Sequence, residues 1–258
     1  MNLKLNLSST NNYTSNSQIA RVLTEGWVKD NGYCPSCGFS HISEFENNKP
    51  VADFFCSNCL EQYELKSKDG IKVGEKIVDG AYSSMITRIN SDENPNFFFL
   101  NYTKSDWTVN NFLIIPKHYF VTSIIEKRKP LSSNAKRAGW IGCNINLSKI
   151  PESGRIFLVK DSKIISKSKV KAKWESTEFL KSKKLESRGW ILDIMNCVDK
   201  IEKKEFTLDE MYTFEKVLKQ KYPNNNHIKD KIRQQLQFLR DKGLIEFAGQ
   251  GKYKKIIL

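Results

Sequence analysis

Apolar residues recur every three or four positions in several stretches of the chain. Over residues 16–29 this spacing predicts an amphipathic helix, with Ser17 as a candidate cap. Thr207 and Glu210 have the spacing of a capping box, which marks the start of another helix. The same periodicity predicts further helices over residues 79–90, 189–201, 207–222 and 227–243, the last closed by Gly243.

Unbroken apolar runs predict buried strands. Residues 96–102 and 109–116 form two such runs, joined by a short polar turn. Further short strands are predicted within residues 139–147, 154–159 and 244–258, the last containing a glycine-rich turn. Strands mixed with helices come first along the chain, and three helices followed by a hairpin come last. This order predicts an α/β domain followed by a winged helix.

The amino-acid composition of the chain changes near Lys160. From there to about Arg188 it is rich in lysine and serine, which indicates a connector, part of which can be helical. We therefore expect two domains. Residues 1–184 form the α/β domain with the connector at its end, and residues 185–258 form the winged helix.

The charge of the chain points to a polyanionic partner. Among 258 residues, 42 are Lys or Arg and 29 are Asp or Glu, so the formal net charge is +13. Such an excess is typical of proteins that bind nucleic acid, although a merely well-solvated surface has the same composition. No apolar run is long enough to span a membrane, and the N-terminus lacks the apolar stretch of a signal peptide. We expect a cytoplasmic monomer without a membrane partner.

The cysteines are spaced as metal ligands. Cys34 and Cys37 form one C-x-x-C pair, and Cys56 and Cys59 form a second, 18 residues further on. Two such pairs can enclose a structural Zn²⁺ in a closed tetrahedron of four thiolates. Four free thiols are the alternative, but two pairs at this spacing favour zinc. The remaining two cysteines have no partner at ligand spacing, and we expect them to pack in the core.

Three charged residues around the second cysteine pair suggest a catalytic site. Glu64 and Lys66 are two residues apart, so on a strand their side chains point to the same face. If the segment of Asp53 lies alongside, two carboxylates and one ammonium converge. Two carboxylates can hold Mg²⁺, which activates water and neutralises phosphate charge. A solvated Glu–Lys pair on a surface strand is the alternative, but the apolar neighbours indicate burial and favour a functional role.

The segment PVADF…ELKSK resembles the catalytic motif of PD-(D/E)XK nucleases. With the cysteine pairs and the segments NPNFFFLNYTK, KRAGWIGCNI and HIKDKIRQQLQFLRDKG, the chain resembles the DpnI-like methyl-directed type II restriction endonucleases along nearly its whole length. The resemblance implies a restriction-endonuclease-like mixed sheet flanked by helices. It also implies Mg²⁺-dependent cleavage of both DNA strands at GATC sites methylated on the adenine amino group.

On this resemblance Asp53, Glu64 and Lys66 are the catalytic residues, and the carbonyl of Leu65 is a further Mg²⁺ ligand. The chain departs from the motif at one point. Its proline, Pro50, stands three residues before Asp53 instead of directly before it.

Two regions are candidates for contacting DNA. The third helix of a winged helix enters the major groove and the wing touches the backbone. The chain offers Asn226, His227, Lys229, Lys231 and Arg233 on the first, and Lys252 and Lys254 on the second. A protein-interaction domain of the same shape is the alternative for this module.

The other candidate is Lys136, Arg137 and Trp140, basic residues next to an indole that could stack on a base. A tryptophan that anchors the next strand in the core is equally compatible with the pattern. The resemblance favours the DNA contact.

Two functions of other kinds fit parts of the sequence. A zinc-containing repair nuclease of the same fold would share the active site but have no methyl specificity. A non-catalytic winged-helix regulator would share the C-terminal module, but it would not need the Asp53, Glu64 and Lys66 trio. The methyl specificity itself comes from the resemblance alone.

Overall fold

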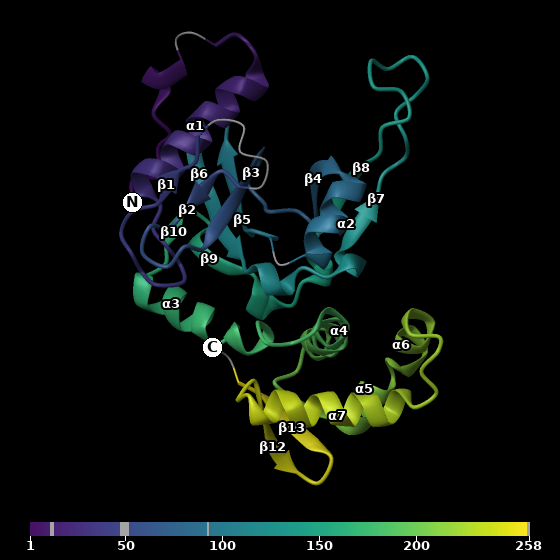
Figure 1. Cartoon of the computed structure of the whole chain (residues 1–258). Coiled ribbons are helices and arrows are strands. Elements are labelled where there is room, and N and C mark those ends of the chain that lie inside the picture. The colour runs from purple at the N-terminus through teal and green to yellow at the C-terminus, as the bar shows by residue number, and fades with distance from the viewer. Residues whose placement is uncertain (11–12, 47–51, 92, 257–258) are drawn as a thin grey trace. The chain divides into compact units, whose positions relative to one another are not determined.

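The computed structural model of the protein describes residues 1–10, 13–46, 52–91 and 93–256 (Figure 1). The chain divides into two compact units. The first comprises Met1–Leu147 and Gly154–Glu178, and the second comprises Ser148–Ser153 and Phe179–Leu258.

The first unit is built on a seven-stranded mixed sheet in the order β1-β2-β3-β5-β6-β9-β10. Strand β3 pairs in parallel with β5, whereas the other neighbours pair antiparallel. The strands are β1 (Ser43–Glu44), β2 (Phe54–Phe55), β3 (Gln62–Asp69), β5 (Asn96–Thr103), β6 (Thr108–Ile115), β9 (Ile156–Lys160) and β10 (Lys163–Ile164). The mixed sheet that the sequence predicts is thus confirmed, as are its two central buried strands.

Both faces of the central strands are covered. Phe98 and Leu100 of β5 lie in a core that also holds the buried side of helix α1 (Asn16–Asn31) and of helix α3 (Lys167–Glu175). Alternate side chains of a strand point to opposite faces, and Phe97 stacks on Phe120 on the other face, with ring centroids 4.4 Å apart. Within the described residues, the central strands of this sheet thus have apolar side chains packed against both faces.

The two helices of this core correct details of the sequence interpretation. Helix α1 has the predicted extent at its start, but its N-cap position is Ser15, so Ser17 is not the cap. Helix α3 lies in the lysine-rich segment that we expected to be a connector. Its Val170 and Trp174 are fully buried in the core of the first unit. Because most of the other residues of α3 are lysines, its narrow apolar side is hard to recognise in the sequence.

A second, smaller sheet of the first unit has the order β4-β8-β7, all antiparallel. Its strands are β4 (Lys76–Ala81), β7 (Ile125–Lys127) and β8 (Gly142–Asn146), and helix α2 (Tyr82–Asn90) follows β4 directly. The sequence predicts a helix from residue 79, which is wrong for its first three positions. Asp79 and Ala81 pair with β8, and this long-range partner is invisible in a local pattern.

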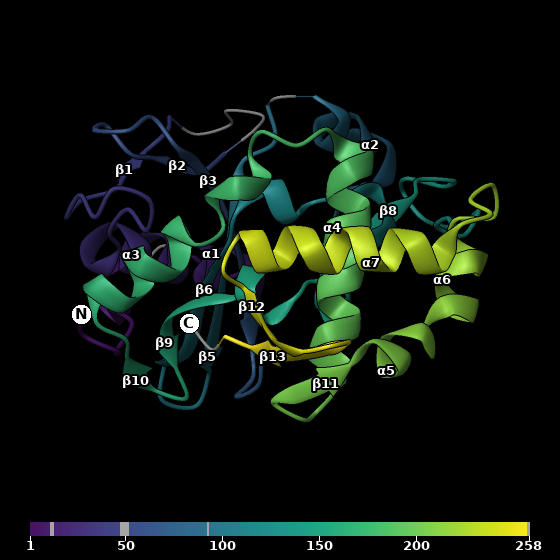
Figure 2. The ribbon, with the colours of Figure 1, turned by 90° about the horizontal axis from the view of Figure 1, so that it is seen from below.

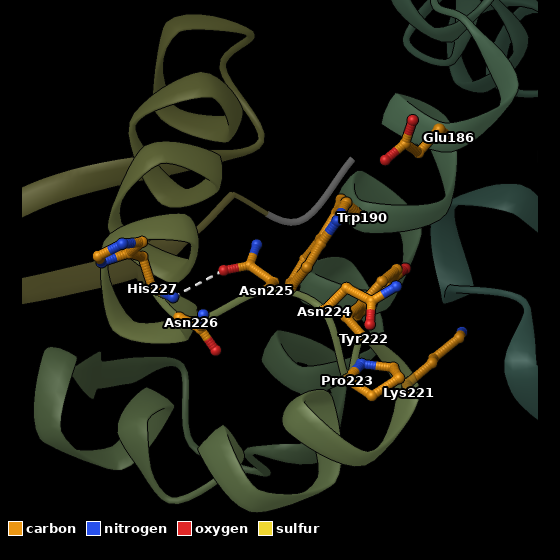
Figure 3. Close-up of a pocket in the computed structure, with 9 residues that line it drawn as sticks. All are labelled: Glu186, Trp190, Lys221, Tyr222, Pro223, Asn224, Asn225, Asn226 and His227. Carbon is orange, nitrogen blue, oxygen red and sulfur yellow. Dashed lines mark hydrogen bonds between the residues drawn. The ribbon is translucent and has the colours of Figure 1, made fainter.

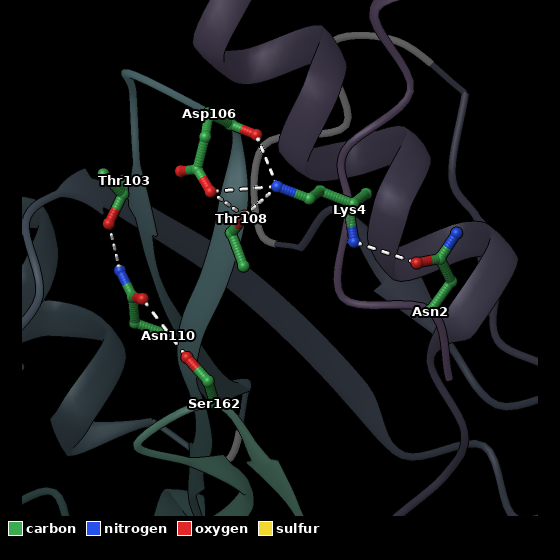
Figure 4. Close-up of polar contacts among 7 residues, drawn as sticks. All are labelled: Asn2, Lys4, Thr103, Asp106, Thr108, Asn110 and Ser162. Carbon is green, nitrogen blue, oxygen red and sulfur yellow. Dashed lines mark hydrogen bonds and ion pairs between the residues drawn. The ribbon is translucent and has the colours of Figure 1, made fainter.

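Hydrogen bonds from Lys4 connect the N-terminal segment to the turn between β5 and β6 (Figure 4). The Lys4 ammonium donates to the Asp106 carboxylate at 2.9 Å and to the Thr108 hydroxyl at 2.7 Å. Within the same hairpin, the side-chain amide of Asn110 on β6 donates to the hydroxyl of Thr103 at the end of β5, at 2.7 Å. The Lys4 contacts are exposed, so we expect each to add little to the free energy of unfolding, whereas Asn110 is buried.

The second unit has the element order of a winged helix, seen in Figure 2, where α7 lies across α4. Its helices are α4 (Leu185–Lys200), α5 (Leu208–Tyr212), α6 (Glu215–Lys221) and α7 (Ile228–Asp241). A three-stranded sheet in the order β11-β13-β12 comprises β11 (Glu205–Thr207), β12 (Ile245–Gly249) and β13 (Lys252–Lys255). Short 3-10 helices in the two units are η1 (Leu7–Thr10), η2 (Lys117–Tyr119), η3 (Thr122–Ile124), η4 (Leu147–Lys149), η5 (Glu152–Gly154) and η6 (Glu178–Leu180).

Local signals of the second unit agree with the sequence at its helix ends. The capping box of Thr207 and Glu210 forms, with hydrogen bonds of 2.8 and 3.2 Å. Gly243 closes α7 with a φ of +70°, a conformation that favours glycine. Two features differ from expectation. The helix predicted over residues 207–222 is split into α5 and α6, and β11, which has a single buried apolar residue, was missed.

Candidate active site and metal centre

The four predicted zinc ligands meet at one point. The sulfur atoms of Cys34, Cys37, Cys56 and Cys59, here called the cysteine cluster, all lie within 4.8 Å of one another. The Cys34 and Cys59 sulfurs are 3.5 Å apart, and those of Cys37 and Cys56 are 3.6 Å apart. A tetrahedron with metal–sulfur bonds of about 2.3 Å places its sulfurs about 3.8 Å apart. The donor set and its spacing therefore fit a metal such as zinc.

Each cysteine pair sits on a tight turn. The amide of Gly38 donates to the Cys34 carbonyl, and the amide of Leu60 donates to the Cys56 carbonyl, both at 2.9 Å. Both turns need a left-handed residue at this position, and Leu60 adopts it with a φ of +61° although it is not glycine. A leucine in this conformation is strained. The cost is consistent with a turn whose geometry is set by four converging sulfurs.

The surroundings of the cysteine cluster shift the pKa values of its thiols in opposite directions. Burial raises the pKa of the Cys34 thiol, whose sulfur also lies 3.0 Å from the hydroxyl of Tyr63. Burial acts in the same direction on Cys37, but hydrogen bonds from the Asn58 side chain and the Phe39 backbone outweigh it and lower its pKa to about 7. The cluster thus offers both a buried thiol and one that ionises near neutrality.

Four phenylalanines lie near the cysteines in the sequence. Phe45 and Phe55 stack with ring centroids 4.5 Å apart, and Phe54 is fully buried, whereas Phe39 is 39% exposed. Cys143 and Cys197, which we expected in the core, are both buried.

The hairpin of β2 and β3, whose turn carries the second cysteine pair, brings the predicted catalytic residues close to one another. The amide of Asp53 donates to the Tyr63 carbonyl at 3.0 Å, so Asp53 lies beside the start of β3. Its carboxylate accepts a hydrogen bond from the amide of Leu65 at 2.7 Å. Glu64 and Lys66 are joined by an ion pair of 2.6 Å. Pro50 and Val51, the start of the motif, lie outside the described residues.

A network of charges surrounds Glu64 and Lys66. The Lys66 ammonium lies 2.6 Å from Glu64 Oε1 and 2.6 Å from Asp79 Oδ1, and the Arg88 guanidinium lies 2.6 Å from Glu64 Oε2. We call Glu64, Lys66, Asp79 and Arg88 the charged cluster. Its side chains are between 4% and 23% exposed. Charges so poorly hydrated are stable only because each has an opposite partner at contact distance.

The protonation of Lys66 follows from this network. Burial lowers the pKa of its ammonium, but the charges of Glu64 and Asp79 outweigh burial and raise the pKa above its usual range. Lys66 is therefore a cation in this arrangement.

Sequence reasoning missed three residues of the site. Asp79 was assigned to a helix, and Arg88 was not singled out, because their proximity to β3 depends on how β4 and α2 pack. Glu25 of α1 is the third. Burial raises its pKa, the nearby Arg21 lowers it, and the charges of Asp53 and Glu44 raise it further. Glu25 thus brings another carboxylate into the neighbourhood of Asp53.

The donors around β3 suit a hard divalent cation. Asp53 and Glu64 contribute carboxylate oxygens and Leu65 a backbone carbonyl, which is the type of ligand that Mg²⁺ takes. Both Glu64 oxygens are engaged by cationic side chains. A metal ion at Glu64 would therefore share or replace one of these partners.

The loop between β7 and β8 carries the other predicted DNA contacts of the first unit. Figure 1 shows it as a long projection between these strands. Lys136 and Arg137 are exposed, and the Arg137 guanidinium lies 5.0 Å from the centre of the Trp140 ring. Trp140 is half-buried, and its ring lies so close to Gly142 that a Cβ there would come within 2.9 Å. The indole is thus neither a core anchor nor fully exposed.

Two of the predicted DNA contacts of the second unit, Asn226 and His227, lie directly before the start of α7. Asn226 and His227 line a pocket of about 580 Å³ (Figure 3). Trp190 and Tyr222 also line it, and their rings stack with centroids 3.6 Å apart. The Asn225 side chain accepts a hydrogen bond from the His227 amide at 2.8 Å. Asparagine side chains and a stacked aromatic pair are suited to base edges and rings.

The cations of α7 and of the wing point outward and are paired at the surface. Lys229 lies 3.7 Å from Glu215, and Lys231 donates to Gln234 at 2.7 Å. Arg233 contacts Asp230 and donates to the Tyr212 hydroxyl at 2.9 Å. On the wing, Lys254 contacts Glu246 at 2.5 Å, and Lys252 is exposed. The predicted apolar side of α7, comprising Ile228, Ile232, Leu236 and Leu239, is fully buried, which confirms the outward direction of the cations.

Comparison with known families covers nearly the whole chain. The model of the Dam-replacing family, named DpnI, matches residues 1–183. The model of the Dam-replacing HTH domain, named DpnI_C, matches residues 186–255. Among the described residues, no helix is long and apolar enough to cross a membrane.

Proposed function

The chain belongs to the Dam-replacing family, whose DpnI-type members are methylation-dependent restriction endonucleases, and we propose that it cleaves both DNA strands at GATC sites methylated on the adenine amino group. The membership indicates a nuclease that binds DNA. The base sequence, the position of the methyl group and the identity of the metal ions are parts of the proposal.

The observation that carries the proposal is the arrangement on β3. Asp53 is tied to the backbone of Leu65 at 2.7 Å, and Lys66 is tied to Glu64 at 2.6 Å. Two carboxylates and an ammonium thus share one end of a hairpin, an arrangement that suits metal-assisted phosphodiester hydrolysis. A regulator that only binds DNA has no need of such charges, most of which lose hydration in this position.

We assign roles to these residues by their chemistry. Asp53, Glu64 and the Leu65 carbonyl would hold Mg²⁺, which when bound supplies an activated water and neutralises charge on the phosphate. Lys66 contributes a positive charge beside this site, and an ammonium there stabilises the negative charge that develops on the phosphate.

The cysteine cluster supports a structural role for Zn²⁺. Four thiolates complete its coordination and leave no position for substrate. The second cysteine pair lies in the turn between β2 and β3, so a bound zinc fixes the hairpin that carries Asp53 and Glu64. The metal thus acts on catalysis through the fold.

The second unit supports recognition of double-stranded DNA. In this proposal α7 enters the major groove with Asn226, His227, Lys229, Lys231 and Arg233, and the wing brings Lys252 and Lys254 to the backbone. Exposed ion pairs such as those on α7 contribute at most about 1 kcal/mol each. Phosphate can therefore replace the acidic partners when DNA binds.

Methyl selection needs more than one contact. Burying one methyl group contributes about 1 kcal/mol, which is too little for a strict choice. We therefore propose two readers of the mark, one at the start of α7 and one in the β7–β8 loop. Trp140, with Lys136 and Arg137 beside it, is the candidate in the loop, because its indole is partly accessible and flanked by cations.

Digestion of one plasmid, prepared with and without adenine methylation, tests the function. We expect fragments at GATC sites from the methylated plasmid only, and only when Mg²⁺ is present. Equal digestion of both preparations would contradict methyl selection and would favour a repair nuclease of the same fold. Binding without cleavage of either would favour a regulator.

A further inference from the structure

Lys66 has a second acidic partner whose role the nuclease motif does not explain. We propose that Asp79 is a positioning residue that holds the Lys66 ammonium in place for DNA cleavage. This inference rests on the proposed function, in which Lys66 acts on the phosphate. Asp79 itself is assigned no contact with substrate or metal.

The two carboxylates that face Lys66 are not equivalent. Glu64 is shared with Arg88 at 2.6 Å, and in the proposed function it is also a metal ligand. Any cation that binds Glu64 weakens its hold on Lys66. Asp79 lies at the same distance of 2.6 Å from the ammonium, and Lys66 is its ion-pair partner within the described part of the chain. Asp79 is thus the partner that can keep Lys66 in position while Glu64 binds metal.

Asp79 is buried more deeply than any other member of the charged cluster. Its side chain is 4% exposed, against 14% for Glu64, 20% for Arg88 and 23% for Lys66. A carboxylate in such a place loses most of its hydration, a cost that a single buried ion pair barely offsets. A hydrophobic residue would stabilise the fold at least as well. The cost therefore argues that the position serves more than stability.

The backbone directs Asp79 towards Lys66 across two sheets. Lys66 belongs to the seven-stranded sheet, whereas Asp79 belongs to β4 of the smaller sheet. Asp79 pairs with Cys143, Ala81 pairs with Gly142, and the residue between them, Gly80, is an extra residue on β4. A β-bulge of this kind bends the strand and changes the direction of adjacent side chains. The irregularity thus lies directly beside the carboxylate.

The test compares three variants with the intact protein on methylated plasmid. Asp79→Asn keeps the size of the side chain but removes its charge, so the ammonium loses its fixed partner. We expect its single-turnover cleavage rate to fall about 100-fold, the scale of a misplacement of about 1 Å in a catalytic group. Asp79→Glu restores the charge, and we expect cleavage about tenfold faster than with Asp79→Asn, on the same scale. DNA binding in Ca²⁺, measured by mobility shift, should match the intact protein for both.

Glu126→Gln is the matched control. Glu126 of β7 forms an ion pair of 2.6 Å with Lys76 of β4, on the same small sheet but outside the charged cluster. Its loss should leave the cleavage rate unchanged, and melting curves of all variants show whether the fold is retained. If Asp79→Asn does not fold, Asp79→Glu decides: a folded Asp79→Glu variant that cleaves as slowly as Lys66→Ala contradicts the proposal, and intermediate cleavage supports it.

Two results would overturn the role of Asp79. One is a cleavage rate of Asp79→Asn within about twofold of that of the intact protein. Such a difference is smaller than the loss of rate expected when a catalytic group is displaced. The other is a loss of cleavage matched by an equal loss of DNA binding, which indicates a merely structural ion pair. Lys66→Ala in the same assay separates this failure from that of the proposed function. If Lys66→Ala cleaves normally, the nuclease assignment of Lys66 itself is wrong.

Discussion

The cysteine cluster and the charged cluster each take two residues from the β2–β3 hairpin of the first unit, but they are completed in different ways. The four sulfurs come from two short turns with the same spacing, and nothing else is needed to enclose an ion. The charged cluster draws Glu64 and Lys66 from β3, Asp79 from β4 and Arg88 from α2. Its charges satisfy one another, so they must rearrange when metal or phosphate arrives. A closed site favours stability, and a mutually paired site favours exchange of partners.

The largest effect is expected when the closed site is opened. Cys56→Ser removes one of four ligands, and structural zinc supplies on the order of 10 kcal/mol to folding. We expect the zinc content to fall from one ion per chain to none, together with loss of the cooperative melting transition and of cleavage. Elemental analysis and thermal melting measure this outcome.

Cys197→Ser is the control for that experiment, because Cys197 is a buried cysteine outside the cluster. It should keep one zinc per chain. If the Cys56→Ser protein retains zinc and melts like the intact protein, the cysteine cluster is not a closed structural metal site.

A smaller but more selective effect is expected in the charged cluster. Lys66→Ala should lower the cleavage rate by about 10²–10³-fold or more, since a charge aimed at the reacting phosphate is lost. Asp53→Ala and Glu64→Ala should do the same. DNA binding in Ca²⁺ and zinc content should not change.

Lys68→Ala is the matched control, two residues further along β3 and exposed. It should cleave like the intact protein. If Lys66→Ala instead unfolds the protein or releases zinc, the charged cluster is a structural element like the cysteine cluster.

The smallest effect is expected outside both clusters. Trp140→Ala should reduce the preference for methylated over unmethylated plasmid by about tenfold, the scale of one lost apolar contact. Melting and zinc content should be unaffected. Leu131→Ala on the same loop, where the side chain is 38% exposed, serves as control. An unchanged preference in Trp140→Ala would place methyl selection in the second unit alone.

The sequence predicted all residues of the cysteine cluster, but only some residues of the charged cluster. The cysteine cluster follows from spacing alone, because each pair forms a local turn. Asp53, Glu64 and Lys66 were identified through the resemblance and the period of a strand. Asp79 could not be, since the pattern of residues 79–90 fits a helix and only pairing with β8 makes its start a strand. The sequence placed α3 in a connector that can be helical in part but did not locate the helix, because its buried side consists of Val170 and Trp174.

The parallel pairing of β3 with β5 has a consequence for the order of folding. Strands β5 and β6 are joined by a short turn and can form a hairpin from neighbouring chain. Strand β3 can join them only after the intervening segment, residues 70–95, has closed a long loop, which is slow because its entropy is lost before contacts form. That segment also contains Asp79 and Arg88. We therefore expect the charged cluster to form after the β5–β6 hairpin, because its residues come from β3 and from the segment that must first close this loop.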